Sequence, residues 1–177
     1  MALKANLLLL CALFLLSYKP TTEAMKLKKT RIQFYMHDVI SGPNPTAVRV
    51  ATPTNYTSPN PVGALFGDIY VMDNPLTVTP SPNSTVIARG QGIYALSSQQ
   101  NEFSLLMSLT VGFISGPYNG STFSILGRNP IMNTVRELPV VGGSGIFRLA
   151  RGYCFAQTHS MANTDAIIGY NVTLLHY

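Results

Sequence analysis

The sequence contains almost no cysteine. It has two in 177 residues, and Cys11 lies in an N-terminal segment that we expect to be cleaved off. Cys154 is then alone, so an internal disulfide is excluded and the fold must depend on its core or on oligomerisation. Cys154 sits in the strand-like run 152–156, where a lone cysteine is usually a small apolar filler rather than a nucleophile.

Motifs for metals, phosphates and redox cofactors are also missing. The three histidines, His37, His159 and His176, lack the spacing of metal ligands, and no cluster of carboxylates accompanies them. There is no nucleophile elbow and no phosphate-binding loop. We therefore expect no metal site and no cofactor, and a protein that does not oxidise its own substrate.

Charged residues make up only 11% of the chain, and the basic residues Lys26, Lys28, Lys29 and Arg31 form one cluster. Such a cluster can bind anionic wall polymers or membrane surfaces, but a solvated tail is the more common outcome. No motif of nucleic-acid recognition is present, so we expect no nucleic-acid partner.

Residues 1–24 have the layout of a cleaved signal peptide. Lys4 supplies a positive start, residues 7–16 form an apolar run, and Thr22-Glu23-Ala24 places small residues at the cleavage positions. The run is shorter than the roughly 20 residues of a membrane-spanning helix, and no second run of that length follows. We expect a secreted mature domain of residues 25–177 with no membrane span.

Four sites fit the rule for N-glycosylation, which agrees with export. They begin at Asn55, Asn83, Asn119 and Asn171, whereas the proline after Asn44 blocks a fifth. We expect at least two of the four to carry glycans.

Short alternating runs fill the rest of the chain, and no long window keeps a helical period. Ile32, Phe34 and Met36 share one strand face with Asp38. Glycine, proline, serine and asparagine separate the runs. The expected strands are 32–38, 47–51, 66–72, 86–96, 103–114, 123–126, 135–141, 146–157 and 166–176.

Eight or nine short strands of this kind indicate a sandwich or a closed barrel. A barrel is favoured because closure removes exposed sheet edges and leaves room for one small ligand. The run Gly142-Gly143-Ser144-Gly145 predicts a tight corner that needs a positive φ or a close approach of the backbone. With no internal repeat, we expect a single all-β domain.

Four ordered stretches are more specific than composition alone. They are Phe34-Tyr-Met-His-Asp38-Val-Ile, Phe66-Gly-Asp-Ile-Tyr-Val-Met-Asp-Asn-Pro75-Leu-Thr, Arg89-Gly-Gln-Gly-Ile-Tyr94 and Val140-Val-Gly-Gly-Ser-Gly-Ile-Phe-Arg-Leu-Ala-Arg151-Gly-Tyr. With the closing segment 170–177, this order resembles that of plant dirigent proteins over essentially the whole mature chain.

The resemblance implies an eight-stranded antiparallel β-barrel of the dirigent and allene oxide cyclase type, a homo-oligomer (a trimer or dimer) and secretion to the apoplast. It implies stereochemical control of phenoxy-radical coupling, as when coniferyl alcohol gives optically active lignans in phenylpropanoid metabolism. A separate oxidase, a laccase or peroxidase, would supply the radicals. Some relatives instead act as enzymes on quinone methides, including ring closure to pterocarpans.

Asp38 is the first candidate catalytic residue. If its strand face points into the barrel, desolvation would raise its pKa and make it a general acid or base toward a phenolic substrate. Asp38 also matches an aspartate of the dirigent family. The alternative is a surface carboxyl that caps a loop.

Arg151 and Tyr94 are further catalytic candidates. Alternation counted from Phe147 places Arg151 on an inward face, where it could hold an oxyanion or pair with Asp38. Tyr94 shares a face with small residues that leave space for a phenol, although core packing is a close alternative. The candidate substrate-binding residues are Phe34, Met36, Arg89, Phe147 and Tyr153.

Two positions depart from the pattern of lignan-forming dirigent proteins. Many of these carry aspartate where this chain has Ile146 and Asn74, which weakens a two-acid mechanism on two equivalent substrates. Three functions stay open, in this order: a non-oxidising guide of radical coupling, a cofactor-free dehydratase or cyclase, and a binding or wall-structural protein without chemistry.

Overall fold

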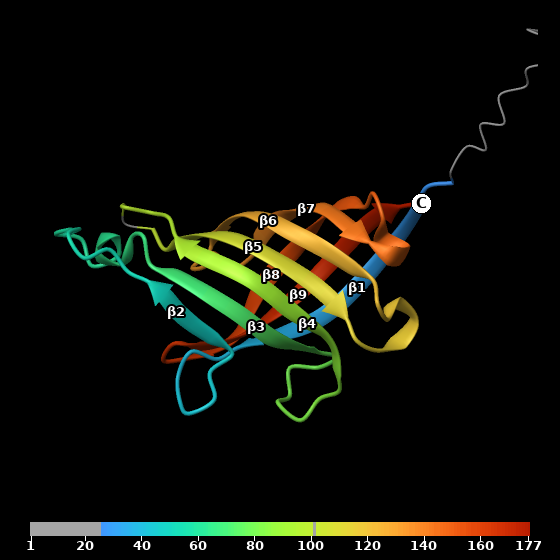
Figure 1. The fold of residues 1–177 in the computed structure, drawn as a ribbon, viewed down its shortest axis with the longest axis horizontal. Helices are drawn as coiled ribbons and strands as arrows, with labels where there is room; N and C mark the ends of the chain where they lie inside the picture. The colour runs from blue at the N-terminus through green and yellow to red at the C-terminus, as the bar shows by residue number, and fades with distance from the viewer. Residues whose placement is uncertain (1–25, 101) are drawn as a thin grey trace, which may run out of the picture.

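The computed structural model describes residues 26–100 and 102–177, which form one twisted antiparallel sheet of nine strands (Figure 1). The strands are β1 (Lys28–Asp38), β2 (Ala47–Ala51), β3 (Ile69–Thr77), β4 (Val86–Leu96), β5 (Ser104–Phe113), β6 (Thr122–Pro130), β7 (Arg136–Ser144), β8 (Arg151–Ala162) and β9 (Asp165–His176). Three single helical turns interrupt them: η1 (Gly63–Leu65), η2 (Gly116–Tyr118) and η3 (Gly145–Phe147). Within these residues no helix is long and apolar enough to cross a membrane.

Pairing between β1 and β3 closes the sheet into a barrel. The strand order runs from β1 through β9, β8 and onward to β3 and β2, and β1 pairs with β3 at Tyr35↔Thr77 and Met36↔Leu76. Eight strands therefore form the ring, while β2 pairs only with β3 among the described strands. The expected eight-stranded antiparallel barrel is confirmed.

Alternating side chains fill the inside of this ring. Ile32, Phe34 and Met36 on β1 are 7%, 1% and 2% exposed, as the alternation predicted. Cys154 is also buried in this core. Burial raises the pKa of its thiol to about 12, so it is a poor nucleophile at neutral pH.

Strand β3 continues past the point where the sequence predicted its end. The expected strand stopped at residue 72, but β3 runs to Thr77 and includes Asn74 and Pro75. Pro75 is paired with Arg89 of β4, whereas β1 pairs with β3 only at the next two residues. Pro75 thus has a paired strand on one side only, a position that tolerates the missing N–H. The extension carries the Asn74 side chain into the barrel wall.

The segment expected as one strand from 146 to 157 is instead the turn η3 followed by β8. Leu149 between them has φ 63°, a left-handed conformation that breaks the alternation. Phe147 and Ala150 are buried, and after the break Cys154 and Ala156 point inward. From Arg151 to Thr158, the residues of β8 therefore have the opposite orientation to the one counted from Phe147. A β-bulge between Thr158 and Ser160 then shifts the alternation again.

The glycine corner lies at the end of β7 and the start of η3. Gly145 has φ +61°, and a Cβ atom on Gly143 would lie 2.6 Å from both the Phe147 and the Thr122 carbonyl oxygens. Both predicted reasons for glycine, a positive φ and a close approach, are found here.

The two neighbouring glycines of this corner give a matched test. Gly143→Ala should lower the free energy of unfolding by about 1–3 kcal/mol, because the new methyl group meets backbone atoms on both sides. A Cβ atom on Gly142 meets nothing within 4 Å, so Gly142→Ala should leave stability nearly unchanged. Equal midpoints of the two variants in urea denaturation would contradict this account of the corner.

Candidate functional site

A cavity of about 360 Å³ opens at the barrel end where β1 finishes and β9 begins. Most of its wall is apolar or aromatic, from Met36, Ile40, Tyr70, Leu96, Phe103, Leu105, Met107, Ile131, Ile168 and Tyr170. Its polar side chains are few, and include Asp38, Tyr94, Asn129, Arg136 and Thr158. An apolar pocket with a few convergent polar groups is typical of sites for small organic ligands.

An aromatic cluster fills the other end of the barrel. Phe147 is fully buried, and its ring centre lies 5.9 Å from that of Phe113, 5.1 Å from Tyr118 and 5.2 Å from His176. Phe34 stacks on Tyr170 at 5.2 Å, between this cluster and the cavity. Among the expected substrate-binding residues, Met36 lines the cavity, whereas Phe34 and Phe147 lie in the core beneath it.

The Asp38 carboxyl lies in the cavity wall. Burial in these apolar surroundings raises its pKa, partly offset by hydrogen bonds from Asn74 and Tyr94, and the nearby Asp165 charge raises it further. Asp38 has no ion-pair partner within the described part of the chain. A raised pKa lets a carboxyl keep its proton to higher pH than a solvated one, which suits it to act as a general acid.

Tyr94 lies beside Asp38. Its side chain is 5% exposed, its hydroxyl donates to Asp38 Oδ2 at a long 3.5 Å, and its ring stacks on Tyr70 at 5.0 Å. Burial, followed by the Asp38 charge, raises the pKa of Tyr94. Tyr94 therefore stays a neutral hydrogen-bond donor beside the carboxyl, and with Tyr70 it presents an aromatic wall to the cavity.

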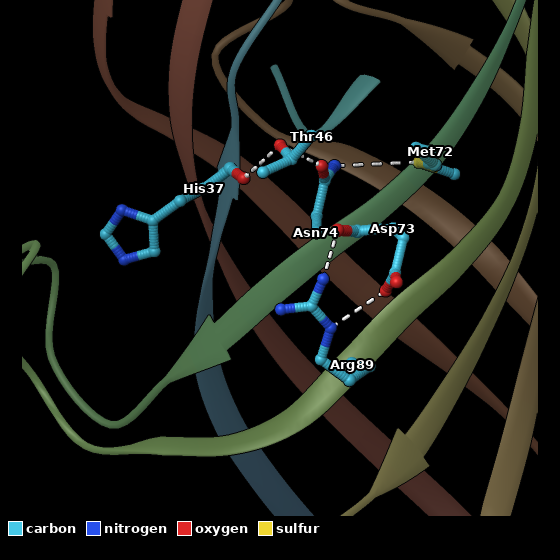
Figure 2. Close-up of polar contacts among 6 residues, drawn as sticks. All are labelled: His37, Thr46, Met72, Asp73, Asn74 and Arg89. Atoms are coloured by element: carbon cyan, nitrogen blue, oxygen red, sulfur yellow. Dashed lines mark hydrogen bonds and ion pairs between the residues drawn. The ribbon is translucent and has the colours of Figure 1, made fainter. Parts of the chain in front are cut away.

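Behind Asp38, the fully buried Asn74 joins the carboxyl to the barrel wall. Figure 2 shows Asn74 with its partners Thr46 and Met72. Asn74 Nδ2 donates to Asp38 Oδ1 at 3.0 Å, and Thr46 Oγ1 donates to Asn74 Oδ1 at 2.6 Å. The His37 ring points away from Asn74 and bonds Thr77 Oγ1 at 2.8 Å instead.

The expectation that Arg151 faces the cavity is wrong. Arg151 is exposed on the outer surface, where its Nη1 donates to the carbonyl oxygens of Val141 and Ala150. Tyr153 is also outside, 38% exposed and in edge contact with Phe155. The cause is the break in alternation at Leu149, which the sequence pattern did not reveal.

Arg89 and Ile146 also lie away from the cavity wall. Arg89 Nε donates to Asp73 Oδ1 at 2.8 Å, in an ion pair whose two side chains are 34% and 53% exposed (Figure 2). Ile146 is 45% exposed on η3. An aspartate at position 146 would therefore not lie in this cavity, contrary to the expectation that the cavity has lost an acid there.

Arg136 is the cationic cavity residue that sequence reasoning missed. It is 3% exposed, and its Nη1 donates to Ile131 O and Asn133 O, both at 3.3 Å, and to Thr158 Oγ1 at 2.8 Å. Its Nε has no hydrogen-bond partner, and no carboxylate pairs with it, among the described residues. Burial lowers the pKa of this guanidinium.

A sequence signal for Arg136 was available. Arg136, Leu138 and Val140 alternate, which is the same argument that was applied to Arg151. Asn129, 3% exposed with Oδ1 unpartnered among the described residues, is in phase with the buried Phe123 and Ile125 but lies beyond the expected end of that strand at residue 126. The cavity thus contains a carboxyl, a separate guanidinium and an amide, all with hydrogen-bonding capacity for oxygen atoms of an aromatic guest.

The comparisons with known proteins agree with this geometry. The model of the family "Dirigent-like protein" matches residues 29–175. The chain belongs to the dirigent family. Dirigent protein 23 of Arabidopsis thaliana is 47% identical over 156 residues, covering 87% of this chain and 81% of the relative.

Other dirigent relatives are named as pterocarpan synthases. Pterocarpan synthase 1 of Glycyrrhiza echinata is 45% identical over 165 residues, covering 91% of this chain and 86% of that protein. The solved structure of the pterocarpan synthase dirigent protein GePTS1 superposes with a TM-score of 0.78 at 44% identity, covering 88% of each chain. This dirigent chain is therefore similar both to proteins named only for the family and to synthases.

The four sequon asparagines, Asn55, Asn83, Asn119 and Asn171, are exposed on this dirigent barrel. Their glycosylation stays a prediction. The expected signal peptide, residues 1–24, lies outside the described residues.

The raised pKa of Asp38 predicts a pH-dependent stability difference. The folded protein holds the proton to higher pH than the unfolded chain, whose aspartate titrates near 3.8. The wild-type barrel should therefore lose stability as pH rises through the interval between the unfolded and folded pKa values. The loss is about 1.4 kcal/mol for each pH unit that this interval spans.

The variant Asp38→Asn removes this titration, so its stability relative to wild type should increase from pH 3 to pH 8. Urea denaturation of both proteins at several pH values measures the difference. Parallel stability curves would show that the fold does not perturb this carboxyl.

Proposed function

We propose that this protein is a cofactor-free dehydratase and cyclase that acts on a phenolic benzylic alcohol through a quinone methide. The observation that carries this proposal is the desolvated Asp38 carboxyl, which faces an apolar, aromatic-lined cavity with Tyr94 beside it. Arg136 in the same wall supplies a cation for the oxygen of the phenol. A site with one acid, Asp38, and one cation, Arg136, suits the binding of one substrate molecule better than the binding of two equivalent molecules.

The proposed reaction begins with proton transfer from Asp38 to the benzylic hydroxyl of the substrate. The C–O bond breaks and its electron pair leaves with water. The phenolic hydroxyl releases its proton to solvent water, and its oxygen becomes the carbonyl oxygen of a quinone methide. Electron density on that oxygen is stabilised by the Arg136 guanidinium. A second phenolic oxygen of the same molecule then attacks the benzylic carbon and closes the ring.

The protons balance at the end of this sequence. The attacking phenol returns its proton to Asp38, and the quinone methide oxygen takes up a proton from solvent water as the ring becomes aromatic again. The net change is loss of one water, and no oxidant is consumed. Because the cavity wall fixes which face of the planar intermediate is attacked, the product is formed with one handedness.

Similarity to two pterocarpan synthases, 45% and 42% identical to this chain, supports a ring-closing activity. A second candidate is the non-oxidising guide of phenoxy-radical coupling, with a separate oxidase that supplies the radicals. The methionines of the cavity wall, Met36, Met107, Met132 and Met161, favour it because flexible thioether side chains adapt to more than one planar ring.

Chiral analysis of products separates the two candidates. One arm gives the protein a benzylic alcohol that carries two phenolic hydroxyls, without oxidase; the other gives it coniferyl alcohol with a laccase. We expect one enantiomer of the cyclised product in the first arm. Asp38→Asn should lower its kcat by about 100-fold or more, because the general acid is lost.

The matched control is Asp73→Asn, which alters a carboxylate paired with Arg89 outside the cavity wall and should keep the activity within about twofold. Enantiomeric excess only in the laccase arm would establish the second candidate instead. Racemic products in both arms would contradict stereochemical control.

We further propose that the protein acts outside the cell. The signal-like segment 1–24 and the exposure of all four sequon asparagines support this location.

Self-association through the outer face of β2 to β6 is also proposed. Val48, Val71, Ile93 and Leu126 are 43–47% exposed and, with Ser108, occupy one row of paired positions across these five strands. Leu106 on β5 extends the patch. A contiguous apolar patch on a sheet face is typical of protein interfaces.

A charged side chain placed in the apolar row across β2 to β6 should prevent the protomers from associating. We expect Ile93→Glu to sediment as a monomer, while wild type and Val141→Glu, which alters an exposed valine on β7, sediment as trimers or dimers. Sedimentation of Ile93→Glu at the wild-type mass would exclude this face as the interface.

A further inference from the structure

The side chains behind Asp38 form a hydrogen-bonded chain with one direction. Its first donor is the Val39 backbone N–H, which donates to Thr46 Oγ1 at 3.1 Å. Because a backbone N–H can only donate, the Thr46 oxygen acts as an acceptor there, and its own proton remains for another partner. The candidates for that proton are Asn74 Oδ1 at 2.6 Å and His37 O at 3.3 Å.

The distances decide the orientation of the Asn74 amide. A separation of 2.6 Å between Thr46 and Asn74 suits an O–H···O bond, and 3.0 Å between Asn74 and Asp38 suits an N–H···O bond. The same Asn74 nitrogen lies 3.7 Å from Met72 Sδ, which is an acceptor (Figure 2). The oxygen of Asn74 therefore faces Thr46, and its N–H₂ group faces Asp38.

We propose that Asn74 is a positioning residue that fixes Asp38 Oδ1 as an acceptor in the wall, so that Oδ2 is the oxygen that carries and delivers the proton. This inference rests on the proposed function and adds which oxygen of the Asp38 acid delivers the proton. Asn74 is fully buried, so it acts through Asp38 rather than on the substrate. The Asp38 proton then lies on the side of Tyr94, whose hydroxyl donates to Oδ2 only at a long 3.5 Å and so holds that oxygen less firmly as an acceptor than Asn74 holds Oδ1.

Other titratable groups near Asp38 do not take the place of Asn74 as the hydrogen-bond donor to Asp38 Oδ1. Tyr94 on β4 and Asp165 on β9 act on the Asp38 carboxyl, and Tyr170 on β9 interacts with its charge. Asp165 accepts hydrogen bonds from the Ile40 and Ser41 backbone N–H groups, both within 2.9 Å. Asp165 is therefore engaged with the loop after β1. Of the two side chains that donate to Asp38, Asn74 makes the shorter hydrogen bond, 3.0 Å against 3.5 Å for Tyr94.

The test is a pH titration of the Asp38 side-chain carboxyl carbon by NMR, on protein with ¹³C-labelled aspartate, assigned with Asp38→Asn. In Asn74→Leu the donor is lost, and we expect the Asp38 midpoint to rise by about one pH unit. In the nearly isosteric Asn74→Asp, two carboxyls share one proton, so we expect two separated steps, the upper one above the wild-type midpoint.

Thr46→Val frees the Asn74 amide to rotate and should raise the Asp38 midpoint by a smaller amount. The matched control is Thr110→Val, which removes a hydroxyl bonded to Ser124 on the outer face and should leave the midpoint unchanged. An Asp38 midpoint in Asn74→Leu equal to that of wild type would overturn the proposal. If Asn74→Leu does not fold, Asn74→Asp provides the test. A single titration step of the Asp38 carboxyl in Asn74→Asp would then overturn the proposal.

The pH dependence of kcat separates this inference from the proposed function. We expect the alkaline limb of the kcat profile to move upward with the Asp38 midpoint in Asn74→Asp. A shifted NMR midpoint with an unshifted kcat profile would confirm the positioning by Asn74 and contradict the role of Asp38 as the acid. A change in thermal stability alone, with both pH curves unmoved, would leave Asn74 with a structural role only and overturn the positioning.

Discussion

The arrangement depends on burying one carboxyl, that of Asp38, in an apolar barrel wall without a cationic partner in the described residues. Such burial is costly unless the carboxyl is neutral or hydrogen-bonded. The protein uses both solutions, because burial raises the pKa of Asp38 while Asn74 holds one of its oxygens. The unfavourable environment is what makes the group useful, since a carboxyl with a raised pKa keeps its proton to higher pH, where the proton is available for transfer.

Closure of the barrel makes this burial possible. Only two residue pairs join β1 to β3, and they lie directly beside Asp38 and Asn74. The aromatic cluster around Phe147 fills the opposite end, so the lumen is a cavity rather than a channel. The cavity is therefore a dead-end pocket with its acid in the wall near the mouth and a separate guanidinium, that of Arg136, in the same wall.

Much of this could be predicted from sequence, because alternation places Ile32, Phe34 and Met36 inside and carries Asp38 with them. The same rule failed for Arg151, since one left-handed residue, Leu149, reverses the orientation of the first part of β8. Arg136 obeys the rule, because it alternates with the buried Leu138 and Val140 on β7. The hydrogen bond from Asn74 to Asp38 joins β3 to β1, and no pattern within one strand contains that information.

The central claim is that an aromatic guest binds between Asp38 and Arg136. The most direct measurement is a crystal structure with an unreactive substrate analogue that lacks the benzylic hydroxyl. The account predicts the analogue in the barrel cavity, with its phenolic oxygen within hydrogen-bonding distance of Arg136 and its benzylic carbon toward Asp38. An analogue bound on the outer face beside Arg151 and Tyr153, with the cavity left without it, would contradict the account.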